Sequence, residues 1–195
     1  CAIFIFFFAA RWYVGTDFHA YYTRFYELLS MSISELIGIR DWGYYVLTAF
    51  IGKYVFTDYF LYSLILGAII YTPVVMTYRK YSNSFTMTCA LYVMMCLYTW
   101  PYNGVRQGVA VSLLFAGFPL LFEKKNWWKY VILVAIAYTF HSTAIMVVPF
   151  IILCRLKPWK KPFVFACIII VTLIILLPNF WTTVINALET IGQSK

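Results

Sequence analysis

Long apolar runs separated by short polar connectors dominate the pattern of the chain. The runs occupy about residues 1–10, 55–78, 84–100, 104–122, 127–153 and 163–178. A helix that crosses a bilayer needs about 20 predominantly apolar residues, and most of these runs approach or exceed that length. We therefore expect an all-α fold, in which residues 1–195 form a single transmembrane domain built as a polytopic helix bundle.

The first run, residues 1–10, is too short to cross a bilayer by itself. We interpret it as part of a longer span, and we expect the chain to be a fragment of a larger membrane protein.

Residues 11–54, the outer segment, mix polar and apolar positions. Apolar side chains recur there at helical spacing, and polar ones fall between them. This pattern predicts an amphipathic helix that lies on the membrane or covers one end of the bundle, with the apolar positions Phe18, Tyr21, Tyr22, Phe25, Leu28, Leu29, Ile33, Leu36 and Ile37. A shorter amphipathic helix is expected to follow between Trp42 and Phe50.

The charged residues predict an orientation. The connectors 79–83, 123–129 and 155–162 hold nine Lys and Arg residues and one acid, whereas the rest of the chain holds six of each sign. Basic connectors stay in the cytoplasm, so these three should be cytoplasmic and the outer segment should face outward.

The run 127–153 allows two topologies. A single span would place the connector 155–162 on the outside, away from the other basic connectors. A broken or re-entrant pair, 127–140 and 142–153, would turn around His141 and keep that connector inside. The charge asymmetry favours the hairpin.

The composition supports a membrane protein and argues against nucleic-acid-binding and metal-binding proteins. The chain is 64% hydrophobic and 11% charged, with a mean hydropathy of +0.81. Its net charge of +8 would point to nucleic acid in a soluble protein, but here the topology accounts for it, and we expect no nucleic-acid partner. The five cysteines have no metal-ligand spacing, so we expect no metal and no cofactor.

Arg106 begins the run 104–122 at its outer end, with Asn103 and Gln107 beside it. A guanidinium near hydrocarbon needs an anionic partner or a wet cavity. A structural alternative is an arginine that only anchors the end of the span. We interpret Arg106, Gln107 and Asn103 as candidates for binding an anionic amphiphile, because arginine matches phosphate oxygens in a bidentate way.

His141 should lie at a depth similar to that of Arg106, because Arg106 lies 17 residues before Glu123 and His141 lies 14 residues after Trp127. Two ionisable groups at one depth indicate a shared outward-facing cavity, in which His141 could act as a general base. The alternative is a hydrogen-bonded structural histidine at a helix break.

Arg11, Asp17 and Tyr21 lie at the outer mouth of the predicted bundle. Asp17 could simply cap the amphipathic helix. It could also act as a base, with Arg11 binding an anion and Tyr21 a sugar ring.

Four stretches in this order resemble the EpsG family of exopolysaccharide polymerases, which is related to the Wzy type. Residues 14–21 resemble its GTD-x-x-x-Y stretch, and residues 41–47 resemble E-P-G-Y-x-x-L with Asp-Trp in place of Glu-Pro. Residues 105–110 resemble its R-Q-x-x-A helix start, and residues 137–144 resemble its F-H-x-S-A stretch. The order and separation match over about residues 10–155.

This resemblance implies a multi-pass enzyme of the bacterial cytoplasmic (inner) membrane. It would join polyprenyl-diphosphate-linked oligosaccharide units at the outer face, in exopolysaccharide, capsule or O-antigen biosynthesis. Such a glycosyltransferase-type polymerase would work among membrane lipids and other polysaccharide-assembly proteins. Arg106 and Arg11 would then bind the diphosphate, and His141 or Asp17 would accept the proton of the acceptor hydroxyl.

Three other functions compete with polymerisation. A flippase or transporter of lipid-linked oligosaccharide could use the same arginines without a reaction. A membrane acyltransferase could use His141 as a base. A non-catalytic subunit of a polysaccharide-assembly complex would need no active site.

Overall fold

The computed structural model describes residues 1–123, 125–176, 182, 185–186 and 190, and all regular structure in that part of the chain is helical. The helices are α1 (Ala2–Ala10), α2 (Phe18–Ser30), α3 (Ile33–Leu36), α4 (Trp42–Tyr54), α5 (Tyr59–Tyr81), α6 (Phe85–Met94), η1 (Trp100–Tyr102), α7 (Val105–Gly117), η2 (Phe118–Phe122), α8 (Trp127–Phe140), η3 (Ser142–Val147), α9 (Val148–Arg155) and α10 (Lys161–Leu176). Positions 177–178 of the predicted run 163–178 and Lys124 of the second basic connector lie outside the described residues.

Two helical stretches among the described residues are long and apolar enough to cross a membrane. They are α5 and the continuous stretch Val105–Phe122, which joins α7 and η2. Shorter apolar helices accompany them, including α6, α8 and the first part of α10. The described part of the chain is therefore helical, with two candidate membrane-spanning stretches.

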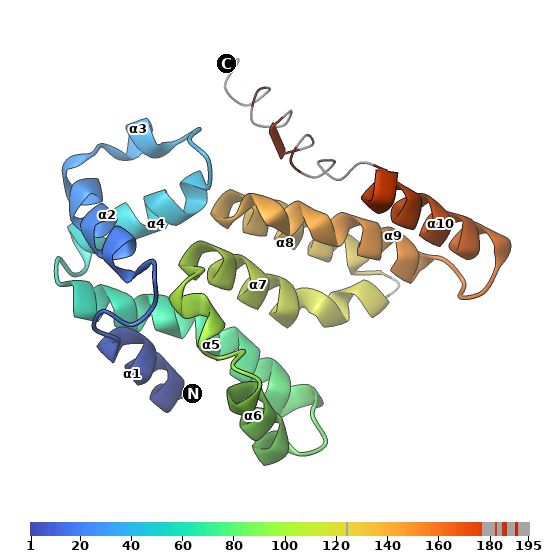
Figure 1. Cartoon of the computed structure of the whole chain (residues 1–195), viewed down its shortest axis with the longest axis horizontal. Helices are drawn as coiled ribbons and strands as arrows, with labels where there is room; N and C mark the ends of the chain where they lie inside the picture. Colours follow the sequence, from blue (N-terminus) through green and yellow to red (C-terminus); the bar gives the residue numbers. More distant parts are fainter. Residues whose placement is uncertain (124, 177–181, 183–184, 187–189, 191–195) are drawn as a thin grey trace.

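The central helix is α5, against which α1 and α7 both pack (Figure 1). Asp58 caps its first turn by accepting a hydrogen bond from the Leu61 N–H at 2.9 Å. Arg79 and Lys80 stand in its last turn, where positive charge interacts favourably with the helix dipole. The apolar middle of α5 is thus bounded by an acid at one end and two bases at the other.

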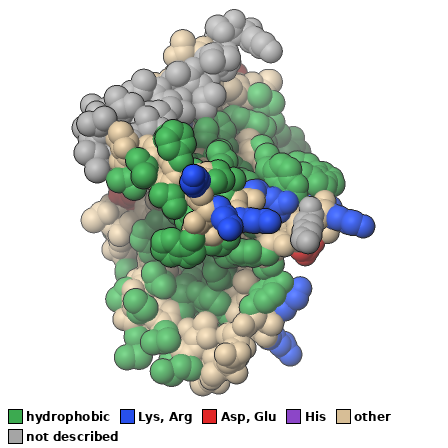
Figure 2. Space-filling model, turned by 90° about the vertical axis from the view of Figure 1, so that its right-hand side faces the viewer, with side chains coloured by type: hydrophobic (Ala, Val, Ile, Leu, Met, Phe, Trp, Pro, Cys, Tyr) green, Lys and Arg blue, Asp and Glu red, His purple; other side chains and the backbone are tan. Residues whose placement is uncertain are grey.

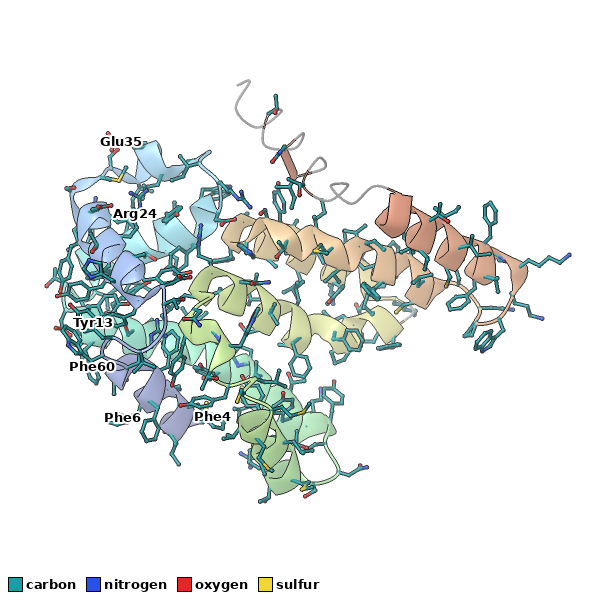
Figure 3. The ribbon with its side chains drawn as sticks, in the orientation of Figure 1. Phe4, Phe6, Tyr13, Arg24, Glu35 and Phe60 are labelled. Atoms are coloured by element: carbon teal, nitrogen blue, oxygen red, sulfur yellow. The ribbon has the colours of Figure 1, made fainter. Side chains whose placement is uncertain are left out.

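One face of α1 is packed and the other is open (Figure 3). Phe4 contacts the rings of Tyr71, Tyr92 and Tyr98, whereas Phe6 is 54% exposed. Gly67 lets α1 approach α5 closely, because a Cβ there would lie 3.1 Å from the Phe8 ring.

The outer segment holds two helices where one was predicted between Phe18 and Ile37. α2 ends at Ser30, and α3 begins after Ser32 in a capping box that it forms with Glu35. The Ser32 N–H donates to Glu35 Oε2 at 2.9 Å, so a new helix start interrupts the apolar periodicity. The prediction of a single continuous helix was therefore wrong, although the apolar positions Phe18, Phe25, Leu28 and Leu36 are buried as it requires.

Prolines and turns shorten two of the apolar runs. In the run 84–100, α6 ends at Met94, and Cys96 adopts a left-handed conformation with φ 55° before η1 begins. In the run 104–122, α7 gives way after Gly117 to η2, which carries a proline in its first turn.

The stretch from Trp127 to Arg155 doubles back at His141. α8 ends at Phe140, His141 is extended, and η3 and α9 follow. The Arg155 guanidinium lies 5.4 Å from the Trp127 ring and donates to the Leu121 carbonyl oxygen at 3.5 Å. The end of α9 therefore lies beside the start of α8.

The molecule has two chemically different ends. α2, α3 and α4 lie together at one end, while the connectors after η2 and α9 lie at the other (Figure 1). Figure 2 shows Lys and Arg side chains gathered on this second end, with little acid among them.

Gly43 sets the distance between α4 and α8, because a Cβ at this position would collide with the Thr139 side chain and lie 3.0 Å from its carbonyl carbon. We expect Gly43→Ala to lower stability by about 1–3 kcal/mol, since a packed contact must open to admit the methyl group. Thermal unfolding in detergent measures this effect. Gly104→Ala is the matched control, because its Cβ would meet Gln107 Oε1 only at 3.5 Å. Equal melting temperatures for the two variants would contradict the prediction.

Candidate functional site

A buried carboxylate, Asp41, organises the site. It precedes α4 in the left-handed conformation (φ 60°, ψ 32°), which aspartate tolerates better than most residues. Its side chain is only 1% exposed. The close approach of Gly43 to Thr139 carries Asp41 to the end of α8, where the helix breaks.

Three groups from distant parts of the chain converge on this carboxylate. Arg106 Nη1 donates to Asp41 Oδ2 at 2.9 Å, and His141 Nδ1 lies 3.3 Å from the same oxygen. The Ser142 backbone N–H donates to Oδ1 at 3.0 Å. We call Asp41, Arg106, His141 and Ser142 the Asp41 cluster. It joins the start of α4, the first turn of α7 and the break after α8.

These partners keep Asp41 ionised. Burial by itself would raise the pKa of the carboxyl group, because it penalises the charge. The hydrogen bond and charge of His141, the charge of Arg106 and the Ser142 N–H together outweigh that effect, so the pKa of Asp41 lies below its ordinary value. The carboxylate therefore remains an acceptor toward both the imidazole and the guanidinium.

Arg106 connects the cluster to the outer segment. Its Nη1 also lies 3.3 Å from the Tyr45 hydroxyl oxygen on α4. The Arg106 side chain is 33% exposed, and that of His141 is 17% exposed. Both side chains therefore bind Asp41 on one side and reach solvent-accessible space on the other.

That space is a polar cavity of about 610 Å³. Of the seven residues predicted from the sequence as site residues, the structure brings six to its wall: Asp17, Tyr21, Asn103, Arg106, Gln107 and His141. Cys96, Thr99, Trp100 and Gly104 complete the lining. The wall thus combines an imidazole oriented by a carboxylate, a guanidinium, a second carboxylate and two amides.

Asp17 stands at the N-cap position of α2, but its side chain makes no capping hydrogen bond. The Thr16 hydroxyl lies 3.4 Å from both Asp17 Oδ1 and Asn103 Oδ1. Gly15 has φ 99°, and a Cβ there would lie 2.6 Å from Asn103 Oδ1. Only glycine allows this loop to press so closely against the loop before α7, which holds Asp17 at the cavity.

Arg11 lies elsewhere. It is 5% exposed and packs between two aromatic rings, with its Cζ 3.9 Å from the Phe8 centroid and 5.1 Å from the Tyr102 centroid. Its Nε and Nη1 have no hydrogen-bond partner among the described residues. The structure therefore packs Arg11 against Phe8 and Tyr102, outside the lining of the polar cavity.

Sequence reasoning did not select Asp41, Tyr45 or Ser142 for the site. A usable signal existed for Asp41, since it occupies the acidic position of the stretch that resembles E-P-G-Y-x-x-L. Among the described residues, no three His, Cys, Asp or Glu side chains come together as metal ligands. The chemistry available in the cavity is proton transfer and binding of anions.

Acid should weaken the cluster. Because the folded-state pKa of Asp41 lies below the unfolded value of about 3.9, its contribution to stability is complete above that pH and is lost as the pH falls through the folded-state pKa. We expect Asp41→Asn to lose about 1–3 kcal/mol at pH 7 and to show a shallower loss of stability below pH 4. Melting temperatures between pH 2.5 and 7 measure both effects.

The control for this comparison is Glu27→Gln, which removes an exposed carboxylate from an ion pair on the surface of α2. It should keep the full acid dependence of the unaltered chain. A pH profile of Asp41→Asn that runs parallel to that of the unaltered chain would contradict the role given to this carboxylate.

One comparison with known proteins assigns the chain to a family. No curated protein and no solved structure gives a match. A family model described as the EpsG family matches residues 1–194, nearly the whole chain. The match includes every residue of the Asp41 cluster and of the cavity wall. The chain therefore belongs to the EpsG family.

Proposed function

We propose that this chain polymerises polyprenyl-diphosphate-linked oligosaccharide units at the outer face of the bacterial cytoplasmic membrane. The observation that carries the proposal is the Asp41 cluster at the wall of a polar cavity, within an otherwise apolar helical bundle. Ionisable groups inside a membrane protein are expensive and usually serve function. Membership of the EpsG family supports the same activity.

The proposed orientation follows from charge. The basic connectors after α5, η2 and α9 would face the cytoplasm. The polar cavity lies among α2, α7 and the His141 turn, toward the opposite end of the bundle. A substrate in the cavity would then be reached from the outer side, where polymer repeat units are assembled in this proposal.

The proposed reaction transfers a glycan from one lipid carrier to an acceptor. The acceptor hydroxyl oxygen forms a bond to the anomeric carbon of the donor, and the bond from that carbon to the diphosphate oxygen breaks. The hydroxyl proton passes to a base, and the lipid diphosphate leaves. Because the donor is already activated, the site needs no cofactor.

His141 is the base that the geometry favours. Its Nδ1 lies at Asp41, so the neutral imidazole would hold its proton on Nδ1 and leave Nε2 as the acceptor. Asp41 would also stabilise the imidazolium that forms. Asp17 remains the second candidate, since its carboxylate lines the same cavity and does not cap α2.

Cationic and amide groups would bind the leaving diphosphate. Arg106, Gln107 and Asn103 line one stretch of the wall at the start of α7. A guanidinium aimed at developing negative charge in a site of low dielectric stabilises the transition state. Arg11 lies outside the cavity lining and would act through the potential of its buried charge. Tyr21 would present its ring to a sugar.

Polymerisation should depend on the two basic side chains of the cavity. We expect His141→Ala to reduce turnover by about 10²–10⁴-fold, as loss of a general base does. Arg106→Ala should reduce it by about 10²–10³-fold, as loss of one transition-state donor does. The measurement is the length distribution of products from purified, reconstituted protein supplied with lipid-linked oligosaccharide.

His19→Ala and Arg79→Ala are the matched controls. His19 stacks on Tyr13 outside the cavity, and Arg79 lies in the last turn of α5. Both should retain activity. Longer products identify a polymerase, whereas movement of the lipid across the bilayer without longer products would identify a flippase and overturn the proposal. Full activity of both cavity variants would refute the assigned roles.

Asp41 should act by positioning His141. In Asp41→Asn the amide can donate to Nδ1, which favours the imidazole tautomer with its proton on Nε2 and removes the base from the cavity. We expect a loss of turnover of about 10²-fold or more, with partial recovery in Asp41→Glu. Steady-state kinetics check this, because lost positioning should lower kcat and leave KM nearly unchanged. An unchanged kcat in Asp41→Asn, or no recovery of kcat in Asp41→Glu, would contradict the positioning role.

A further inference from the structure

A second hollow of about 250 Å³ lies next to the polar cavity and differs from it in chemistry. Trp100 lines both spaces. The second hollow is bordered mainly by apolar side chains of α5, α6, η1 and α7, among them Leu97, Pro101, Val111 and Phe115. We call it the Trp100 groove.

The groove exists because α6 is short. α6 ends at Met94, and the chain then turns into η1. Pro101 of η1 packs directly on α7, since a Cβ at Gly108 would lie 2.9 Å from the Pro101 Cβ. Beyond this contact, the α7 surface at Val111 and Phe115 stays exposed.

The groove continues the polar cavity along α7. Gln107 lines the polar cavity, and Val111 follows it by four residues, so both lie on the same side of α7, about 6 Å apart along the helix axis. A molecule whose charged group lies beside Gln107 would therefore find apolar surface about one helical turn further on.

The lining offers little to a polar ligand. Ser112 is buried, and its hydroxyl donates to the Val109 carbonyl oxygen at 2.9 Å, so it is already satisfied. The rings of Tyr92 and Phe115 each lie 5.4 Å from Tyr78. Four side chains of the lining are exposed, so a chain in the bilayer could enter from the side: Leu97, Trp100, Val111 and Phe115.

We propose that the Trp100 groove binds the first isoprene units of the polyprenyl carrier while its diphosphate lies in the polar cavity. This inference rests on the proposed function and adds the subsite that selects the lipid. Trp100 marks the boundary between the two halves of the substrate. Because the tail comes from the bilayer and not from water, the groove contributes van der Waals packing against the isoprenoid carbons, which a tailless substrate lacks.

Photo-crosslinking tests the subsite directly. The probe is a polyprenyl diphosphate that carries a diazirine on its first isoprene unit, added to the purified full chain in lipid nanodiscs. We expect labelled peptides that contain residues 97–101 and 108–115, and at least tenfold less label after competition with unlabelled polyprenyl diphosphate. Competition by a phospholipid of equal concentration should not reduce the label. Label confined to other faces of the bundle, or removed equally well by phospholipid, would overturn the subsite.

Kinetics separate this inference from the proposed function. Val111→Trp should fill the groove and lower kcat/KM at least tenfold for the polyprenyl-linked oligosaccharide. It should change kcat/KM by less than threefold for the same oligosaccharide on methyl diphosphate. Met76→Trp is the control, because Met76 is an exposed residue of α5 outside the groove.

The outcomes are distinct. Equal losses for both substrates in Val111→Trp, or no loss for either, would overturn the groove and leave the polymerase in place. Crosslinking at the groove without any chain extension by the unaltered protein would overturn the polymerase and leave the lipid subsite.

Discussion

The buried Asp41 carboxylate is the interaction on which the rest of the site depends. It holds an arginine from α7, a histidine and a backbone N–H from the turn after α8, and it does so from the start of α4. A buried ion needs such partners, because removal of its water costs several kcal/mol. The same partners that keep the carboxylate charged also hold three helix ends together. The Asp41 cluster therefore also connects the outer segment to the bundle.

This connection explains why a largely apolar protein contains a polar cavity. The outer segment supplies Asp17 and Tyr21, while the bundle supplies Asn103, Gln107 and the two basic side chains. Neither part holds a site by itself. The aromatic packing of α2 on α5, in which the Phe25 and Tyr62 ring centroids lie 4.6 Å apart, then holds the outer segment against the bundle, with Gly15 and Gly43 at close approaches.

Much of the site could be predicted from the sequence because charges are rare in apolar runs. Arg106 and His141 stood out for that reason, and their similar distances from the basic connectors predicted similar depths. Asp41 could not be selected in the same way, since it lies in a polar segment where an acid is ordinary. Its role comes from its left-handed backbone conformation and from the approach of Gly43 to Thr139, which is a contact between residues far apart in the sequence. Arg11 was expected at the cavity on the basis of its position along the chain, but it packs on Phe8 and Tyr102, outside the cavity lining. The division between α2 and α3 depends on a local capping box that apolar periodicity does not register.

Because the chain doubles back at His141, the length of α8 sets the position of that histidine. The helix has fourteen residues: Trp127, the first, lies beside the end of α9, and His141, directly after the last, contacts Asp41. One inserted residue would lengthen α8 by about 1.5 Å and rotate its C-terminal end by about 100°. Such a change would aim the imidazole away from its carboxylate even if every apolar contact of α8 were repaired. We therefore expect exposed side chains of α8 to tolerate substitution, whereas a change in the number of residues between Trp127 and His141 should disrupt the site.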